Sequence, residues 1–166
     1  MQVGAAVAYP PHGVGQIVQR ETRIVHGVEE EIVVIDFGSD LSVTLPLSRA
    51  RELLRPPVSK DGLRLVEKTL GEDVALSDET WPKRMNEAQA RLKGGDPVEL
   101  AEIVRDAARR DRGVSPSGTP SKLSASERSL YLKARESLAS EIAIVRGIGP
   151  EEADAWIEAQ LAPPGG

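Results

Sequence analysis

One stretch decides the fold of the N-terminal part of the chain: residues 29–46, which read EEEIVVIDFGSDLSVTLP. Its first half contains the β-branched run Ile32-Val33-Val34-Ile35, which is typical of a strand. Gly38-Ser39-Asp40 follows as a turn, and apolar residues then alternate with polar ones up to Pro46. Proline cannot donate a hydrogen bond to a neighbouring strand, so it ends the run. The stretch therefore predicts two consecutive strands that fold back on each other.

The residues before this stretch extend the same pattern. Residues 3–9 form a short apolar run, and residues 14–24 are rich in β-branched side chains and close at His26-Gly27, a plausible hairpin tip. Four or five short strands at this spacing predict a small barrel of the SH3 or Tudor type.

The residues after this stretch follow a helical period instead. The change begins at Ser48, and Arg55-Pro56-Pro57 is a natural junction because the backbone before proline is held extended. Helices are predicted over residues 59–70 and 81–92, then after Asp96-Pro97, after Ser124 with Glu127 as its capping box, and from Pro150 onward. The fold class is therefore α+β: a small barrel domain over residues 1–55, then a compact all-helical domain over residues 56–166.

Composition excludes several kinds of chemistry. The chain has 166 residues, no cysteine and two histidines, His12 and His26, each beside a glycine in a predicted turn. We expect no catalytic residue, no metal site and no cofactor, and therefore no enzyme. No segment resembles a membrane span or a secretory signal, so we expect a cytoplasmic protein. A net charge of −5 argues against binding DNA through a broad basic face.

The most informative local motif is Trp81-Pro82-Lys83-Arg84, at the start of a predicted helix. Two cations in a first turn oppose the helix dipole, which favours anions there. Such a helix start can instead meet an external phosphate, and an aromatic side chain beside it suits stacking or wedging between bases. The alternative is a core role, because Trp81 lies on the same helical side as Met85 and Leu92. The residues alone leave both open.

Two further features have a structural and a functional interpretation. Arg105, Arg109 and Arg112 line one face of a predicted helix, which indicates either a solvated surface or a ligand site. Gly147-Ile148-Gly149-Pro150 resembles the turn of a helix-hairpin-helix, whose backbone N–H groups bind phosphate. A helix that ends at Gly147 and a new one that begins at Pro150 explain the same residues without DNA.

Four motifs in order resemble the bacterial CarD/CdnL family: Tyr9-Pro10-Pro11-His12-Gly13-Val14-Gly15, Val43-Thr44-Leu45-Pro46, Trp81-Pro82-Lys83-Arg84, and Ala101-Glu102-Ile103-Val104-Arg105-Asp106. The similarity covers nearly the whole chain and includes Lys133-Ala134-Arg135-Glu136-Ser137-Leu138. It implies a Tudor-like domain that binds the β subunit of bacterial RNA polymerase, and a helical domain that contacts promoter DNA.

The resemblance also implies roles for individual residues. Trp81 would wedge into the minor groove at the upstream edge of the transcription bubble and stabilise the open promoter complex, with Lys83 and Arg84 as the basic positions beside it. Arg23, Thr44 and Pro46 would contact the polymerase. We expect the protein to act as a monomer. The alternative function is a protein-interaction module whose helical half makes no DNA contact, and a buried Trp81 would favour it.

Overall fold

The structure is a computed structural model, and it describes residues 1–10, 12–112 and 123–161. Contacts within the chain divide it into two compact units, Met1–Pro57 and Val58–Gly166. Each unit has its own buried core, so each is described by itself. The described residues form strands followed by helices, which confirms the predicted α+β fold class.

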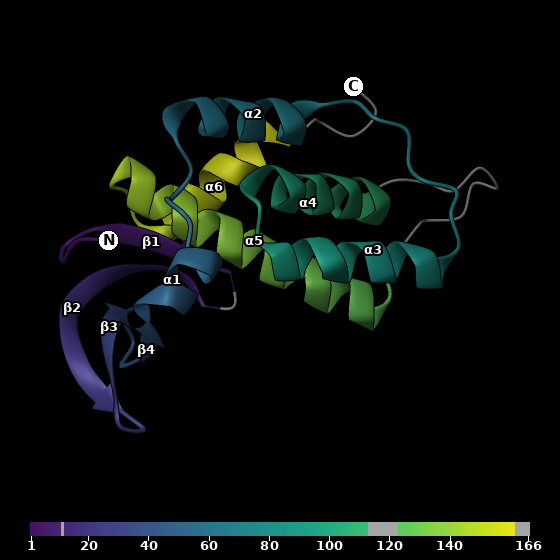
Figure 1. The fold of residues 1–166 in the computed structure, drawn as a ribbon. Helices are drawn as coiled ribbons and strands as arrows, with labels where there is room; N and C mark the ends of the chain where they lie inside the picture. Colours follow the sequence, from purple (N-terminus) through teal and green to yellow (C-terminus); the bar gives the residue numbers. More distant parts are fainter. Residues whose placement is uncertain (11, 113–122, 162–166) are drawn as a thin grey trace. The chain divides into compact units, whose positions relative to one another are not determined.

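The first unit is a single antiparallel sheet that curls into half of a barrel (Figure 1). Its strands follow the order of the sequence: β1 (Ala6–Tyr9), β2 (Gly13–Val25), β3 (Val28–Asp36) and β4 (Ser42–Pro46). A short helix, α1 (Leu47–Leu53), continues directly from β4. The stretch over residues 29–46 thus folds as predicted, and Pro46 is the last residue of its strand.

One face of the sheet carries the core of this unit. Ile17 and Ile35 are paired across β2 and β3 and are fully buried, and Val33 packs with Leu47 and Ala50 of α1. Gly15 lets the strands close over this core, because a Cβ there would lie 2.7 Å from a ring carbon of Phe37. Side chains alternate along each strand, so Ala8, Val14 and Ile32, which are also buried, lie on the opposite face of the sheet.

The second unit is a helical bundle in which α4 (Pro97–Arg112) packs against α2 (Lys60–Gly71), α3 (Trp81–Gly94) and α5 (Ala125–Arg146). The last helix, α6 (Pro150–Gln160), packs against α5 and α2. The caps predicted at Asp96 and Ser124 are present: Asp96 accepts hydrogen bonds from Val98 and Glu99, and Ser124 accepts one from Glu127. Ser59, predicted as the first residue of a helix, instead caps α2 by accepting a hydrogen bond from Gly62. The core is contributed by all five helices; its fully buried members include Val66, Leu70, Val104, Leu138, Ile142 and Ile157.

A charged cluster joins α5 to α6 at the edge of this core. Arg135 donates to the carboxylate of Asp154 at 2.6 and 3.1 Å, to Glu158 at 2.9 Å and to the hydroxyl of Tyr131 at 2.7 Å. Arg112 of α4 also binds Glu158. Only about 14% of the Arg135 side chain is exposed. The cluster therefore links three helices: Arg135 joins α5 to α6, and Arg112 joins α4 to α6.

Glu158 makes this cluster sensitive to acid. Burial raises the pKa of Glu158, but hydrogen bonds from Arg135 and Arg112 outweigh burial and hold the pKa below its usual range. The ionised Glu158 carboxylate therefore stabilises the folded state fully above about pH 4.3, where a glutamate in the unfolded chain titrates. This stabilisation is lost as pH falls through the lower pKa of Glu158 in the folded state. We expect urea unfolding of Glu158→Gln to show a smaller loss of stability between about pH 5 and 3 than the parent protein shows. If the free energy of unfolding fell equally with pH in the two proteins, this role of Glu158 would be contradicted.

Candidate nucleic-acid interface

The start of α3 is built to place an aromatic side chain at a fixed corner. Trp81 is the first residue of the helix, and Pro82 occupies a first-turn position where its fixed backbone angle suits a helix. Thr80, the capping residue, makes no side-chain cap, and the first turn contains no acidic residue. Apart from Pro82, the helix start therefore lacks two features that normally stabilise it, a side-chain cap and a first-turn acid, in agreement with the pattern in the sequence.

Trp81 lies outside the core of the helical unit. Its side chain is 43% exposed, whereas Met85, one turn later, is 8% exposed and belongs to the core. The core role considered for Trp81 is therefore filled by Met85 instead. The indole is nevertheless tethered, because its Nε1–H donates to Glu127 Oε1 at 2.8 Å and to Ser124 Oγ at 3.3 Å.

Both cations of the motif have partners within the chain. The Lys83 ammonium lies 3.0 Å from a carboxylate oxygen of Glu79, and this hydrogen bond raises the pKa of Lys83. Lys83 is largely exposed, so the pair is a weak surface contact that a phosphate can displace. Arg84 is mostly buried: it donates to the Glu79 carbonyl at 3.0 Å, and its Nη2 lies 3.6 Å from Glu127 Oε2.

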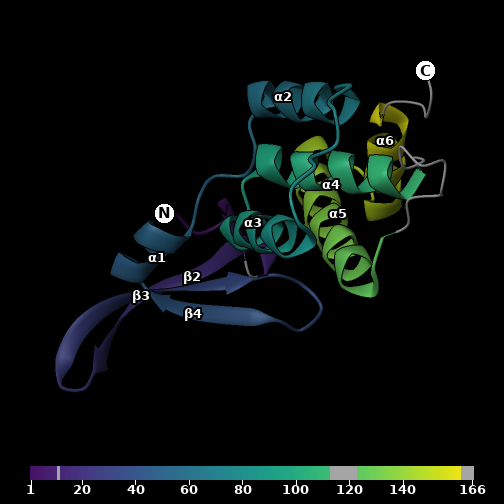
Figure 2. The same cartoon turned by 90° about the vertical axis from the view of Figure 1, so that its right-hand side faces the viewer.

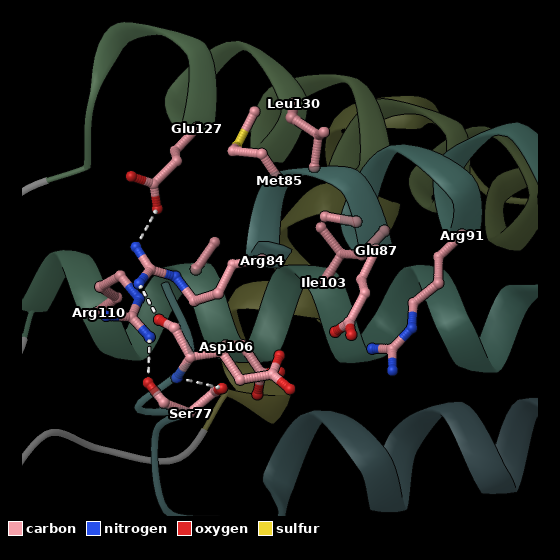
Figure 3. Close-up of a pocket in the computed structure, with 13 residues that line it drawn as sticks. Ser77, Arg84, Met85, Glu87, Arg91, Ile103, Asp106, Arg110, Glu127 and Leu130 are labelled. Atoms are coloured by element: carbon pink, nitrogen blue, oxygen red, sulfur yellow. Dashed lines mark hydrogen bonds and ion pairs between the residues drawn. The ribbon is translucent and has the colours of Figure 1, made fainter. Parts of the chain in front are cut away.

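Arg84 lines a cavity of about 320 Å³ between α3, α4 and α5, and its side chain points into this cavity (Figure 3). Arg110 faces Arg84 there and donates to the Ser77 carbonyl at 3.2 Å. Burial, and then the charge of Arg84, lower the pKa of Arg110. Four carboxylates also line the cavity, on Glu79, Glu87, Asp106 and Glu127. The cavity is therefore of mixed charge, unlike a binding site for a small anion.

The arginines on one face of α4 form ion pairs within the chain. Arg105 is buried and pairs with Glu72 and Asp106, Arg109 pairs with Asp73, and Arg112 pairs with Glu158. The sequence did not indicate this outcome, because the partners of Arg109 and Arg112 lie 36 and 46 residues away.

The glycine hairpin has the backbone predicted for a helix stop and restart. Gly147 adopts a left-handed conformation with φ of 66° at the end of α5, and Gly149 caps α6. The first turn of α6 carries Glu151 and Glu152. Their charges suit the helix dipole and repel phosphate, so this turn is a poor DNA contact.

The three residues implied in polymerase binding lie on β2 and β4 of the sheet. Thr44 and Pro46 lie on β4, an edge of the sheet, opposite Val34 and Ile32 of β3. Arg23 lies on β2 opposite Glu30. It is two positions along the strand from Glu21, which pairs with Ile32. Directly paired residues share a face, and side chains alternate along a strand. Arg23, Thr44 and Pro46 therefore lie on one face, opposite to Ile17, Val33 and Ile35 of the core.

The sequence predicted Ser124 and Glu127 only as a helix cap. Both also bind the indole of Trp81, from 43 and 46 residues away in the chain. Nothing in the local pattern of α5 indicates this second role. Only the packing of α3 beside α5 brings the cap and the indole together (Figures 1 and 2).

The fold defines a class: a protein with a curled β-sheet unit followed by a helical unit. In the residues that the structure describes, no group of His, Asp or Glu side chains is arranged to hold a metal ion. No helix in the same residues is long and apolar enough to cross a membrane.

Comparison with known proteins identifies the family. Residues 65–158 match the family model described as CarD, C-terminal domain, and residues 1–58 match the one described as CarD-like/TRCF RID domain. The chain belongs to the CarD family of transcription regulators, which confirms the resemblance found in the sequence. It is 28% identical over 151 residues to the Bacillus subtilis (strain 168) protein named "Putative transcription factor YdeB", covering 89% of this chain and 93% of that protein.

Proposed function

We propose that this protein binds the β subunit of bacterial RNA polymerase and stabilises the open promoter complex by wedging Trp81 into the minor groove at the upstream edge of the transcription bubble. The observation that carries the proposal is an exposed indole held at the rigid start of α3. Proteins that bend or open DNA insert apolar side chains between base steps in this way. In this proposal the protein acts in the cytoplasm as a monomer, without a cofactor and without covalent chemistry.

Lys83 is the cation best placed to meet a phosphate beside the wedge. It is exposed, and Glu79 holds it only by a surface ion pair. Arg84 is the second basic position of the motif, but its guanidinium is already bound to Glu127 and to the Glu79 carbonyl. With a net charge of −5, the protein needs the polymerase to deliver it to DNA. Docking raises the effective concentration of a weak local contact.

Arg23, Thr44 and Pro46 make up the proposed polymerase surface, over the domain of residues 1–55, while residues 56–166 contact DNA. The shared face of the three side chains supports this assignment. Arg23 pairs with Glu21 of the same strand and lies opposite Glu30. A charge reversal there would place three carboxylates together on the surface.

We expect Arg23→Glu in the full-length protein to weaken binding to purified RNA polymerase by about tenfold or more, because charges at an interface govern association strongly. Arg49→Glu is the matched control, since Arg49 is exposed on α1 of the same unit and pairs only with Glu52 among the described residues. A pulldown or a titration measures both. Equal binding by Arg23→Glu and the parent protein would remove Arg23 from the polymerase surface.

A further inference from the structure

The carboxylate of Glu127 lies between the indole and the guanidinium. Its Oε1 accepts from Trp81 Nε1 at 2.8 Å, and its Oε2 lies 3.6 Å from Arg84 Nη2. Only about 14% of the Glu127 side chain and 23% of the Arg84 side chain are exposed. The two oxygens of one carboxylate therefore connect a more exposed aromatic side chain to a shielded cation.

Glu127 and Arg84 are each held by further hydrogen bonds. The backbone N–H of Glu127 donates to Ser124 Oγ at 3.2 Å, so the carboxylate stands on a capped first turn of α5. Arg84 is held from the other side by the Glu79 carbonyl at 3.0 Å. Figure 3 shows Arg84 and Glu127 pointing toward each other, with Arg110 beside Arg84 and bound to the Ser77 carbonyl.

An exposed aromatic side chain on its own samples several rotamers, and ordering it on binding costs free energy. A hydrogen bond from the indole to a shielded, ion-paired carboxylate selects one of these orientations before DNA is met. Hydrogen bonds to charged groups are stronger than neutral ones. The arrangement thus preorganises the side chain that the proposed function requires.

We propose that Glu127 is a positioning residue for Trp81, and that Arg84 acts by positioning Glu127 rather than by binding a phosphate itself. This inference rests on the proposed function, because Trp81 must meet DNA for its orientation to matter. It assigns the two basic positions of the motif different tasks: Lys83 faces the phosphate, and Arg84 supports the wedge from within the protein.

The test begins with the free protein. The chain has two tryptophans, so a Trp156→Phe background leaves Trp81 as the single indole N–H signal in a ¹⁵N-resolved NMR spectrum. We expect Glu127→Ala to shift this signal, because the indole loses its hydrogen bond to the carboxylate. The exchange of the indole N–H with water should become faster by about fivefold or more, which corresponds to the loss of one such hydrogen bond. Glu127→Gln retains an acceptor oxygen and is expected to restore much of the protection. Glu136→Ala is the control, because Glu136 is exposed on α5.

The second measurement is the lifetime of open promoter complexes formed with RNA polymerase and each variant. We expect Glu127→Ala and Arg84→Met to shorten the lifetime by about fivefold or more, and Glu127→Gln to fall between Glu127→Ala and the parent. Circular dichroism establishes that each variant is folded. If Glu127→Ala does not fold, Arg84→Met and Glu127→Gln carry the same test.

The outcomes separate the two proposals. An indole signal that is unchanged in Glu127→Ala overturns the positioning role. A changed signal with an unchanged lifetime, where Trp81→Ala does shorten the lifetime, also overturns it. If Trp81→Ala itself leaves the lifetime unchanged, the proposed function fails, and the positioning role fails with it even where the NMR signal shows the contact. Added salt weakens a contact between a cation and a phosphate. If the binding of the parent protein to promoter complexes weakens with salt, and Arg84→Met is the variant that reduces this salt dependence, then Arg84 binds phosphate directly.

Discussion

Trp81→Ala is expected to remain folded and bound to RNA polymerase, while losing most of its stabilisation of open promoter complexes. Stacking of a base on an aromatic side chain contributes about 1–3 kcal/mol, so the open-complex equilibrium should shift by roughly 5- to 150-fold. The fold should survive because Trp81 is exposed and lies outside the buried core. Circular dichroism, a polymerase pulldown and an open-complex lifetime assay measure the three properties on one variant.

Leu65→Ala is the matched control for this variant. Leu65 is also an exposed apolar side chain, on α2 of the same unit, and its removal should leave the lifetime unchanged. Loss of folding in Trp81→Ala would return the indole to a structural role. A folded Trp81→Ala variant with an unchanged lifetime would favour the alternative function, a protein-interaction module whose helical half does not contact DNA.

Arg135→Met is expected to destabilise the helical unit by about 1–3 kcal/mol. It removes the cation that binds Asp154, Glu158 and Tyr131. Breaking a buried ion pair is destabilising because it leaves a charge without its partner, here the carboxylate of Asp154, whereas Glu158 keeps Arg112. The loss stays below the roughly 3–5 kcal/mol seen for fully buried pairs, because nearly half of each carboxylate side chain is exposed to solvent.

Tryptophan fluorescence during urea unfolding measures this loss selectively, because Trp81 and Trp156 both lie in the helical unit. Arg64→Met is the control: Arg64 forms an ion pair with Asp61 in which both side chains are largely exposed, and its removal should change the stability very little. If the two variants were equally stable, the Arg135 cluster would not be a structural clamp.

Local chemistry explains which parts of the fold could be predicted. The alternating pattern up to Pro46 and the caps at Ser59, Asp96 and Ser124 depend on neighbours within a few residues, and the structure contains these elements. The barrel is open rather than closed, because β1 and β4 lie at opposite edges of the sheet. Alternation within each strand gives no information about closure.

Long-range pairing explains what could not be predicted. The motif at Trp81 indicated an unusual helix start, but it gave equal standing to Lys83 and Arg84. Arg84 differs from Lys83 because Glu127 of α5 forms an ion pair with it. Arg105 and Arg109 are likewise not simply solvated, because they form ion pairs with Glu72 and Asp73. Charge pairs between distant segments carry no local periodicity, so only the packed helices determine which cations remain free.

The most direct test of the proposed wedge is to locate residue 81 on a promoter. A photo-crosslinking amino acid in place of Trp81, in a complex with RNA polymerase and promoter DNA, is predicted to crosslink at the upstream edge of the transcription bubble. The same substitution at Leu65 should give no DNA crosslink there. Crosslinks from position 81 to polymerase alone, or to DNA far from the bubble edge, would contradict the account.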